Sequence, residues 1–308
     1  MPYPETRGDD KDLSQILQKL RGEVLVRSGA TGTMVQQKGA ALGGCIGQWI
    51  VDHPEPYQEL LQEYFQVGCH ICGGGTSGLN RFRLEKYGLQ GKARELNEKI
   101  IRLACEIKPR EGWVAGIIGP TGKFLKPAGE LSFEEALGAF SEQAEALAKG
   151  GADLIAIDTF YDLEEAVAAL RAVKSATRLP VAVSFAFDPG PKGFHTMMGL
   201  SPEDAAVRAE NEGADIVGAN CGGLTLDQVA PVIERMKKSC RIPVSAKPNA
   251  GAPRVVEGKE VYKATPEQFA EKVPEWVKAG VRMISGCCGT TPQHLEKMVI
   301  CLKALPSP

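Results

Sequence analysis

The chain has 308 residues, of which 43% are hydrophobic and 24% charged, and its formal net charge at neutral pH is −2. This balance is typical of a soluble globular protein, and the charge offers no general attraction for nucleic acids or anionic membranes. No apolar run approaches the ~20 residues that span a bilayer, and the first residues show no signal-peptide pattern. Nine cysteines without a secretion signal indicate reduced thiols and predict a cytoplasmic protein.

Strand-like and helix-like segments alternate along the chain. Residues 11–21 have the apolar spacing of a short amphipathic helix, so we predict an N-terminal helical extension over residues 1–22 and one barrel domain over residues 23–308. Each expected strand is followed by a helix-like segment. Eight strands are expected at or near residues 24–26, 69–72, 113–118, 153–157, 180–185, 217, 243–245 and 281–284.

This alternation predicts the fold class. The strands are nearly continuous apolar runs, as in buried parallel sheets. Several helices end in small residues and glycine just before a strand, as at residues 151–153, which is typical of helix C-caps. A doubly wound open sheet is the main alternative, but eight consecutive units fill the chain and no nucleotide-binding fingerprint follows the first strand. We therefore predict an α/β fold, a single-domain (β/α)8 TIM barrel.

Three cysteines follow predicted strands where a barrel places its reactive groups. Cys221 follows the sixth strand, and Cys287 and Cys288 follow the eighth, so all three are expected at the C-terminal mouth. Gly286 and Gly289 permit the sharp turn that lets two adjacent thiols reach one metal ion. Three thiolates on zinc, with the fourth position open, describe a catalytic rather than a structural site. The alternative is that Cys221 is only a small buried hydrophobic residue.

The other cysteines are weaker candidates. Cys69 and Cys72 form a rival metal or redox pair, but alternation within a strand places them on opposite faces and favours core packing. Cys45, in a glycine-rich segment, is left undecided. Packing is expected for the cysteines on or beside helices, Cys105, Cys240 and Cys301.

Polar residues on the same loops are candidates for substrate binding. The turn at residues 28–33 has N–H groups that could hold a carboxylate or phosphate, although such turns are also common without a ligand. Asp158 ends the fourth strand and either meets an ammonium group or caps the following helix. Asn249 ends the seventh strand and is expected beside the metal. His195 is either a general base or a solvated loop residue.

Taken together, these residues resemble the zinc-dependent homocysteine S-methyltransferase family, which includes betaine–homocysteine methyltransferase and the homocysteine-binding module of cobalamin-dependent methionine synthase. The resemblance covers nearly the whole chain from about residue 20 and looks closest to the methionine synthase module. It implies a (β/α)8 barrel and zinc at Cys221, Cys287 and Cys288. The matching segments are residues 29–33, 119–122, 220–221, 248–251 and 286–292, of which the last is the most specific.

The resemblance also implies a mechanism. Zinc with three thiolates carries a net charge of −1, and a substrate thiol that takes the open position loses its proton. A thiol with a pKa of ~8.5 is mostly protonated at neutral pH, so coordination supplies the thiolate. The implied substrate-binding set is Ser28, Gly29, Ala30, Thr76, Asp158, Asn220 and Asn249.

The chain departs from the family pattern around the substrate. Ser28 stands where the family usually has Asp, and Asp158 stands where it has the Glu that grips the substrate amine. Residues 74–77, which include Thr76, replace a usual Thr-Asn-Thr-Phe segment. These changes remove anchors for an amino acid while the three cysteines are intact.

Two enzymatic hypotheses follow. The first is methyl transfer to homocysteine, which gives methionine. The second is exchange of a methyl group between a larger O-, S- or N-methyl compound and a corrinoid protein, with zinc as Lewis acid. A non-enzymatic zinc module ranks last because it needs four ligands. We find no cobalamin-binding segment, so the expected methyl carrier is a separate corrinoid (cobalamin) protein docking at the barrel mouth, with a small free donor as the alternative.

Overall fold

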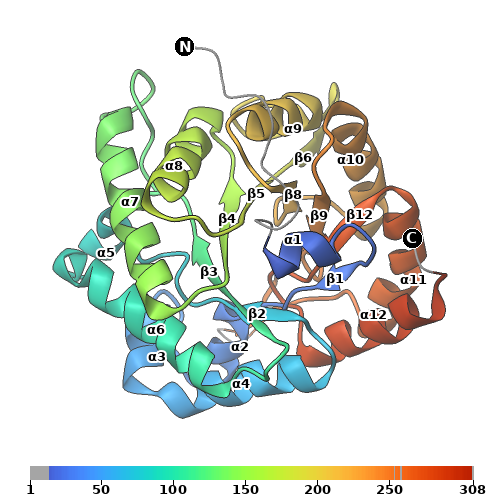
Figure 1. Ribbon diagram of the computed structural model, residues 1–308, viewed down its shortest axis with the longest axis horizontal. Coiled ribbons are helices and arrows are strands. Elements are labelled where there is room, and N and C mark those ends of the chain that lie inside the picture. Colours follow the sequence, from blue (N-terminus) through green and yellow to red (C-terminus); the bar gives the residue numbers. More distant parts are fainter. Residues whose placement is uncertain (1–13, 253, 257–258, 307–308) are drawn as a thin grey trace.

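Eight parallel strands curl into a barrel surrounded by helices (Figure 1). The computed structural model describes residues 14–252, 254–256 and 259–306. The predicted α/β barrel is confirmed, because the strands pair in the order β1-β12-β9-β8-β5-β4-β3-β2. The barrel strands are β1 (Leu25–Val26), β2 (Ile71–Gly73), β3 (Trp113–Ile118), β4 (Leu154–Phe160), β5 (Val181–Phe185), β8 (Ile216–Asn220), β9 (Val244–Lys247) and β12 (Val281–Ile284).

The first and second strands close the barrel. Arg27, just after β1, forms a parallel bridge with Ile71 of β2. Two backbone hydrogen bonds flank this bridge: the His70 N–H donates to the Val26 carbonyl, and the Ser28 N–H donates to the Ile71 carbonyl, each at 2.8 Å. The closure brings residues after β1 and β2 next to those after β12.

Most helices cover the outside of the barrel, whereas α1 lies across one end of it (Figure 1). The helix ends follow local capping chemistry. The Ser132 hydroxyl accepts a hydrogen bond from the Glu135 N–H at 3.2 Å, which starts α7. Gly151 ends α7 in the left-handed region, with φ of +100°. The helices are α1 (Gln15–Lys19), α2 (Gly32–Gln37), α3 (Ile46–Asp52), α4 (Pro54–Gln66), α5 (Arg81–Glu85), the 3-10 turn η2 (Gln90–Lys92), α6 (Ala93–Ile107), α7 (Phe133–Gly150), α8 (Leu163–Ala176), α9 (Pro202–Asn211), α10 (Leu226–Ser239), α11 (Pro266–Lys278) and α12 (Pro292–Ala304).

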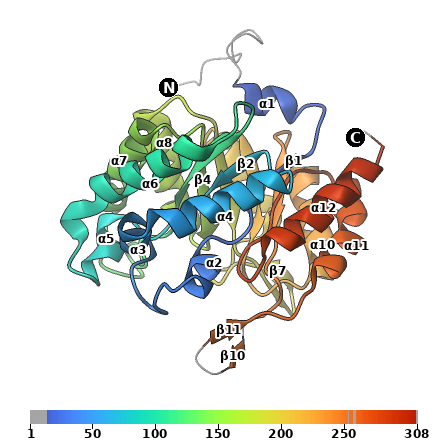
Figure 2. The ribbon, with the colours of Figure 1, turned by 90° about the horizontal axis from the view of Figure 1, so that it is seen from below.

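The two ends of the barrel are built differently. At one end Ile16 and Leu20, in and just after α1, are buried among interior side chains of the barrel strands. The opposite end carries the loops that follow the strands, including the β10–β11 hairpin (Arg254–Val256 and Lys259–Val261). Figure 2 shows α1 and this hairpin at opposite ends of the molecule. The mouth is therefore the accessible end of the barrel interior.

Some features differ from the sequence expectation. Two antiparallel hairpins, β6–β7 (Asp188–Gly190 and Gly193–His195) and β10–β11, interrupt the alternation after β5 and β9. The predicted helix over residues 11–21 is α1, and residues 1–13 lie outside the described residues, so the division at residue 22 stays a prediction. Within the described part of the chain, no helix has both the length and the apolar character to cross a membrane.

Candidate metal and substrate site

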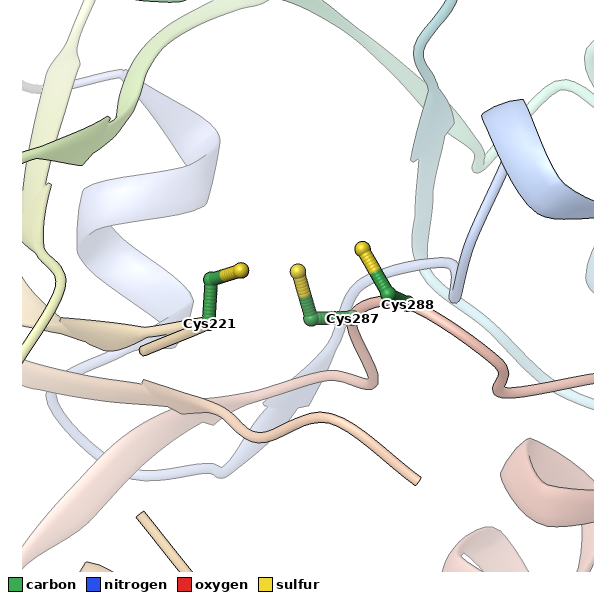
Figure 3. A group of neighbouring side chains, drawn as sticks. All are labelled: Cys221, Cys287 and Cys288. Carbon is green, nitrogen blue, oxygen red and sulfur yellow. The ribbon is translucent and has the colours of Figure 1, made fainter. Parts of the chain in front are cut away.

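Three cysteine side chains converge at the mouth of the barrel. Cys221 comes directly after β8, and Cys287 and Cys288 lie in the loop between β12 and α12. Their sulfur atoms all lie within 4.8 Å of one another. Figure 3 shows the three side chains entering the same space from two different loops. Cys287 is buried and the other two are half-buried, so the group lies at the inner end of the mouth.

The turn that carries the adjacent cysteines depends on its glycines. Gly289 has φ of +79°, and a Cβ there would come within 2.0 Å of the Tyr262 ring. A Cβ on Gly286 would come within 2.4 Å of the Thr290 side chain. The Cys287 N–H donates to the Pro248 carbonyl at 2.7 Å, which ties this turn to the loop after β9. A side chain at either glycine would displace the two thiols.

Cys221 is held in an unusual backbone conformation. Its φ is +56°, and Thr159 at the end of β4 has φ of +70°. The Asn220 side chain connects these strands, because its amide donates to the Thr159 hydroxyl at 2.6 Å and its oxygen accepts from the Thr159 N–H at 2.8 Å. Asn220 therefore positions the end of β8, where Cys221 begins the loop.

Two amide side chains also contact the thiol group. The Asn249 amide lies 3.6 Å from the Cys221 sulfur and donates to the Gly222 carbonyl at 3.1 Å. The Asn220 amide lies 3.9 Å from the Cys287 sulfur. Hydrogen bonds of this kind orient metal ligands and moderate the charge on their sulfur atoms.

The three thiols share their protons unequally. Hydrogen bonds from Cys221 and Cys288 hold the pKa of Cys287 well below its usual range. The hydrogen bond to Cys287 raises the pKa of Cys221 to about 11, and the hydrogen bonds with its two neighbours also raise the pKa of Cys288. A divalent cation would release the remaining protons.

A second group of side chains, Arg27, Asp158 and Lys247, lies in the barrel beside the cysteines. Arg27 forms a two-pronged ion pair with the Asp158 carboxylate, and the Lys247 ammonium lies 3.0 Å from Asp158 Oδ2. Burial alone would raise the pKa of Asp158, but the charges of Arg27 and Lys247 outweigh it and hold this pKa well below its usual value. Sequence reasoning missed both cations, although each stands at the end of an apolar strand.

A pocket of about 580 Å³ connects these two groups at the mouth. Of the predicted substrate-binding residues, Ser28, Gly29, Ala30 and Asp158 line it together with the three cysteines. Among the described residues, the lining does not include Thr76, Asn220 or Asn249.

Thr76 is placed away from the pocket by its hydrogen bonds. Its hydroxyl accepts from the Ile117 N–H and donates to the Ile117 carbonyl, both at 2.8 Å, and the residue is fully buried. It joins the segment after β2 to β3. Its role in the structure is to connect these strands.

The rival pair, Cys69 and Cys72, is buried as predicted, but the prediction that strand alternation separates the two thiols is wrong. Strand β2 begins at Ile71, so Cys69 precedes the strand and alternation does not separate the two thiols. Burial raises the pKa of Cys72 most, and a hydrogen bond with Cys69 raises it further. Of the remaining cysteines, Cys240 is buried and Cys45, Cys105 and Cys301 are half-buried. His195 lies half-buried on β7.

Comparisons with known proteins give a consistent result. A family model described as homocysteine S-methyltransferase matches residues 25–302. The methionine synthase of Mycobacterium leprae is 30% identical over 304 residues and that of Mycobacterium tuberculosis 28% over 318, covering 92% and 97% of this chain. These alignments cover 25% and 26% of the relatives, so the chain spans about a quarter of their length.

Solved structures show the same fold. The homocysteine methyltransferase MmuM from Escherichia coli matches in its metallated form with a TM-score of 0.77 and in its oxidized form with 0.78. The matches cover 92% and 93% of this chain and 99% of the MmuM chain, at 22% identity. A methyltransferase from Methanosarcina mazei has a TM-score of 0.60 at 11% identity, over 94% of this chain and 97% of its own. Because these sequence identities are low, the structural matches show that the fold is shared and no more than that.

Proposed function

This chain belongs to the homocysteine S-methyltransferase family, and on that premise we propose that it transfers a methyl group to a thiol at a zinc site formed by Cys221, Cys287 and Cys288. The observation that carries the proposal is the convergence of three sulfurs from two loops at the mouth of a barrel of this family. The family description favours homocysteine as the acceptor and methionine as the product.

The three cysteines fit a zinc ion. In a tetrahedral site with Zn–S bonds of about 2.3 Å, neighbouring sulfurs lie about 3.8 Å apart, and the three sulfurs here lie within 4.8 Å of one another. Thiolates are ligands that zinc prefers, and three protein ligands leave a fourth position open. When bound, zinc would supply the positive charge that lowers the pKa of the acceptor thiol and makes it a nucleophilic thiolate.

The residues of the chain then have separate tasks. Asn249 donates to the Cys221 sulfur and restricts its orientation. The pocket admits the acceptor between the cysteines and the turn after β1. In the reaction the bond between the methyl group and its donor breaks, a bond between methyl and the acceptor sulfur forms, and the thiol proton is released to solvent.

The methyl donor is the second part of the proposal. We place it on a separate corrinoid (cobalamin) protein that docks at the barrel mouth, on the strength of the resemblance to the methionine synthase module; a small free methyl donor is the alternative. Neither the family match nor the relatives favour the hypothesis of a larger methylated substrate that passes its methyl group to a corrinoid protein.

The proposal is tested by incubating zinc-loaded protein with homocysteine and methylcobalamin, and measuring methionine by mass spectrometry. We expect methionine formation that stops when zinc is removed by a chelator and resumes when zinc is restored. Methionine formation that is unaffected by zinc removal would contradict the proposed site. Absence of any methylated thiol, with this donor or with small methyl donors, would contradict the proposed activity.

A further inference from the structure

The charges that line the pocket are unevenly distributed. Its charged lining residues are Arg27, Arg83, Lys247 and Asp158, so three cations face one carboxylate. Arg27 and Lys247 contact that carboxylate. The pocket beside the cysteines is therefore cationic, apart from the thiols themselves.

Most of the hydrogen-bonding positions of Asp158 are taken by two cations of the protein, which would also repel a substrate ammonium group. A carboxylate accepts about four hydrogen bonds. Asp158 Oδ1 accepts from the Arg27 guanidinium at 3.3 Å, and Oδ2 accepts from the second Arg27 nitrogen and the Lys247 ammonium. The Ser184 hydroxyl also lies 3.1 Å from Oδ1, but its single proton is shared with Asn220 Oδ1 at 2.7 Å. The Asp158 side chain is only 5% exposed. A ligand amine would therefore compete with cations that already belong to the protein.

Of the two cations that contact Asp158, Lys247 is the one that remains available to a ligand. Arg27 and Asp158 alone make a paired and neutral unit, because the guanidinium matches the carboxylate with two donors. An ammonium group has three donors, and the contact with Asp158 uses one of them. The Lys247 side chain is 17% exposed, against 6% for Arg27, and it lines the pocket with the cysteines.

We infer that the acceptor is a thiol carboxylate, whose acidic group is held by Lys247, and that the pocket does not bind a substrate amine. The inference rests on the proposed function, in that the acceptor thiol is taken to bind at the cysteines. It narrows the substrate class to thiols that carry a carboxylate a few bonds from sulfur. An amino group on the acceptor is tolerated at best.

The competing explanation is that Lys247 only balances the negative charge of the cysteines. Three thiolates on a divalent cation carry a net negative charge, which alone favours a cationic thiol over an anionic one. A preference for the anion therefore requires a specific contact. If Lys247 were only a counter-charge, its removal would weaken the neutral thiol, which binds as a thiolate, as well as the thiol carboxylate.

Four matched thiols separate these possibilities. They are 3-mercaptopropanol, which is neutral, 3-mercaptopropylamine, 4-mercaptobutyrate, and homocysteine, which carries both charged groups. Binding to Co(II)-substituted and zinc-loaded protein is measured by the sulfur-to-cobalt absorption band and by calorimetry. We expect 4-mercaptobutyrate to bind at least as tightly as homocysteine, and at least about tenfold more tightly than 3-mercaptopropylamine.

Variants at position 247 complete the test. Lys247→Met should remove the preference for the carboxylate, by about tenfold or more, and leave 3-mercaptopropanol binding unchanged. Lys247→Arg should keep the preference. Lys123→Met, in the pocket that adjoins this one, is the matched control and should bind the series like the unaltered protein.

The outcomes distinguish the inference from the proposed function. Binding of all four thiols without a preference for the carboxylate, or tighter binding of homocysteine than of 4-mercaptobutyrate by tenfold, would overturn the inference alone. A loss for 3-mercaptopropanol as large as the loss for 4-mercaptobutyrate in Lys247→Met would assign Lys247 to charge balance and also overturn it. If no thiol, the neutral one included, changes the cobalt spectrum, the proposed function fails and the inference fails with it.

Discussion

The two groups that meet in the pocket are opposite in character. Cys221, Cys287 and Cys288 come from loops and present like groups to one another, so they need a cation to hold three negative charges together. Arg27, Asp158 and Lys247 come from the ends of strands and satisfy one another within the folded chain. The contrast shows that the two groups at the mouth come from different parts of the fold. The loops carry the candidate metal ligands, and the strand ends carry the charged residues that face a ligand.

The largest expected change in stability comes from removing the carboxylate at the centre of the charged group. Asp158→Asn keeps the shape but leaves two cations without their shared carboxylate in a buried site, and we expect it to lower the free energy of unfolding by about 3–5 kcal/mol. Lys247→Met leaves the Arg27–Asp158 pair intact and should therefore lower the free energy of unfolding less than Asp158→Asn does. Urea unfolding of metal-free protein measures both. Equal effects of the two substitutions would show that the carboxylate is not the centre of the group.

The next largest expected effect is the loss of zinc affinity when one of the three cysteines is replaced. Cys221→Ser removes one of three thiolates, and we expect zinc affinity to fall at least about a hundredfold, on the order of 2.7 kcal/mol, without a change in fold. Competition with a chromophoric chelator gives the affinity, and circular dichroism monitors the fold. Cys301→Ser, on α12 and outside the group, is the control and should bind zinc normally. Zinc binding that survives Cys221→Ser would remove Cys221 from the site.

A pH experiment sharpens the contrast. Because the folded state lowers the pKa of Asp158, its contribution to stability is fully present above the unfolded pKa of about 4 and is lost as pH falls below it. We expect this carboxyl to contribute a slope of about 1.4 kcal/mol per pH unit to the free energy of unfolding on the acid side. Asp158→Asn should lack that part of the slope. The same acid slope in both proteins would contradict the assignment.

The smallest effect concerns the residues around the cysteines. Asn249→Ala removes the amide that contacts the Cys221 sulfur, and we expect about tenfold weaker metal binding together with a shift of the sulfur-to-cobalt band. Stability should change little, since Asn249 donates otherwise only to the Gly222 carbonyl among its described contacts. An unchanged band would indicate that the amide does not act on the sulfur.

The sequence allowed one of these groups to be predicted and not the other. The barrel strands were visible as apolar runs, and the position of each cysteine after a strand predicted which end of the barrel it faces. Arg27 and Lys247 are 131 and 89 residues away from Asp158, so their pairing depends on which strands close the barrel. The position of Arg27 and Lys247 at the ends of apolar strands indicates that they face the barrel mouth. It does not indicate which residue they pair with.

Two local features of the sequence have a structural setting that the sequence does not reveal. Thr76 stands in a segment aligned with family substrate contacts, yet its hydroxyl is used by the backbone of β3. Cys69 was separated from Cys72 by strand alternation, although β2 starts only at Ile71. The Cys69 interpretation failed because side-chain direction was assigned before the exact start of a strand was known. Short strands make this assignment especially sensitive.

The central claim is that three cysteines hold one zinc ion and leave one position for the acceptor. X-ray absorption at the zinc edge of the loaded protein, recorded with and without 4-mercaptobutyrate, tests it most directly. We predict one zinc per chain with three sulfur neighbours, rising to four sulfurs when the thiol is added. Fewer than three sulfurs, or a coordination shell that stays the same on adding this thiol, the neutral 3-mercaptopropanol or homocysteine, would contradict the account.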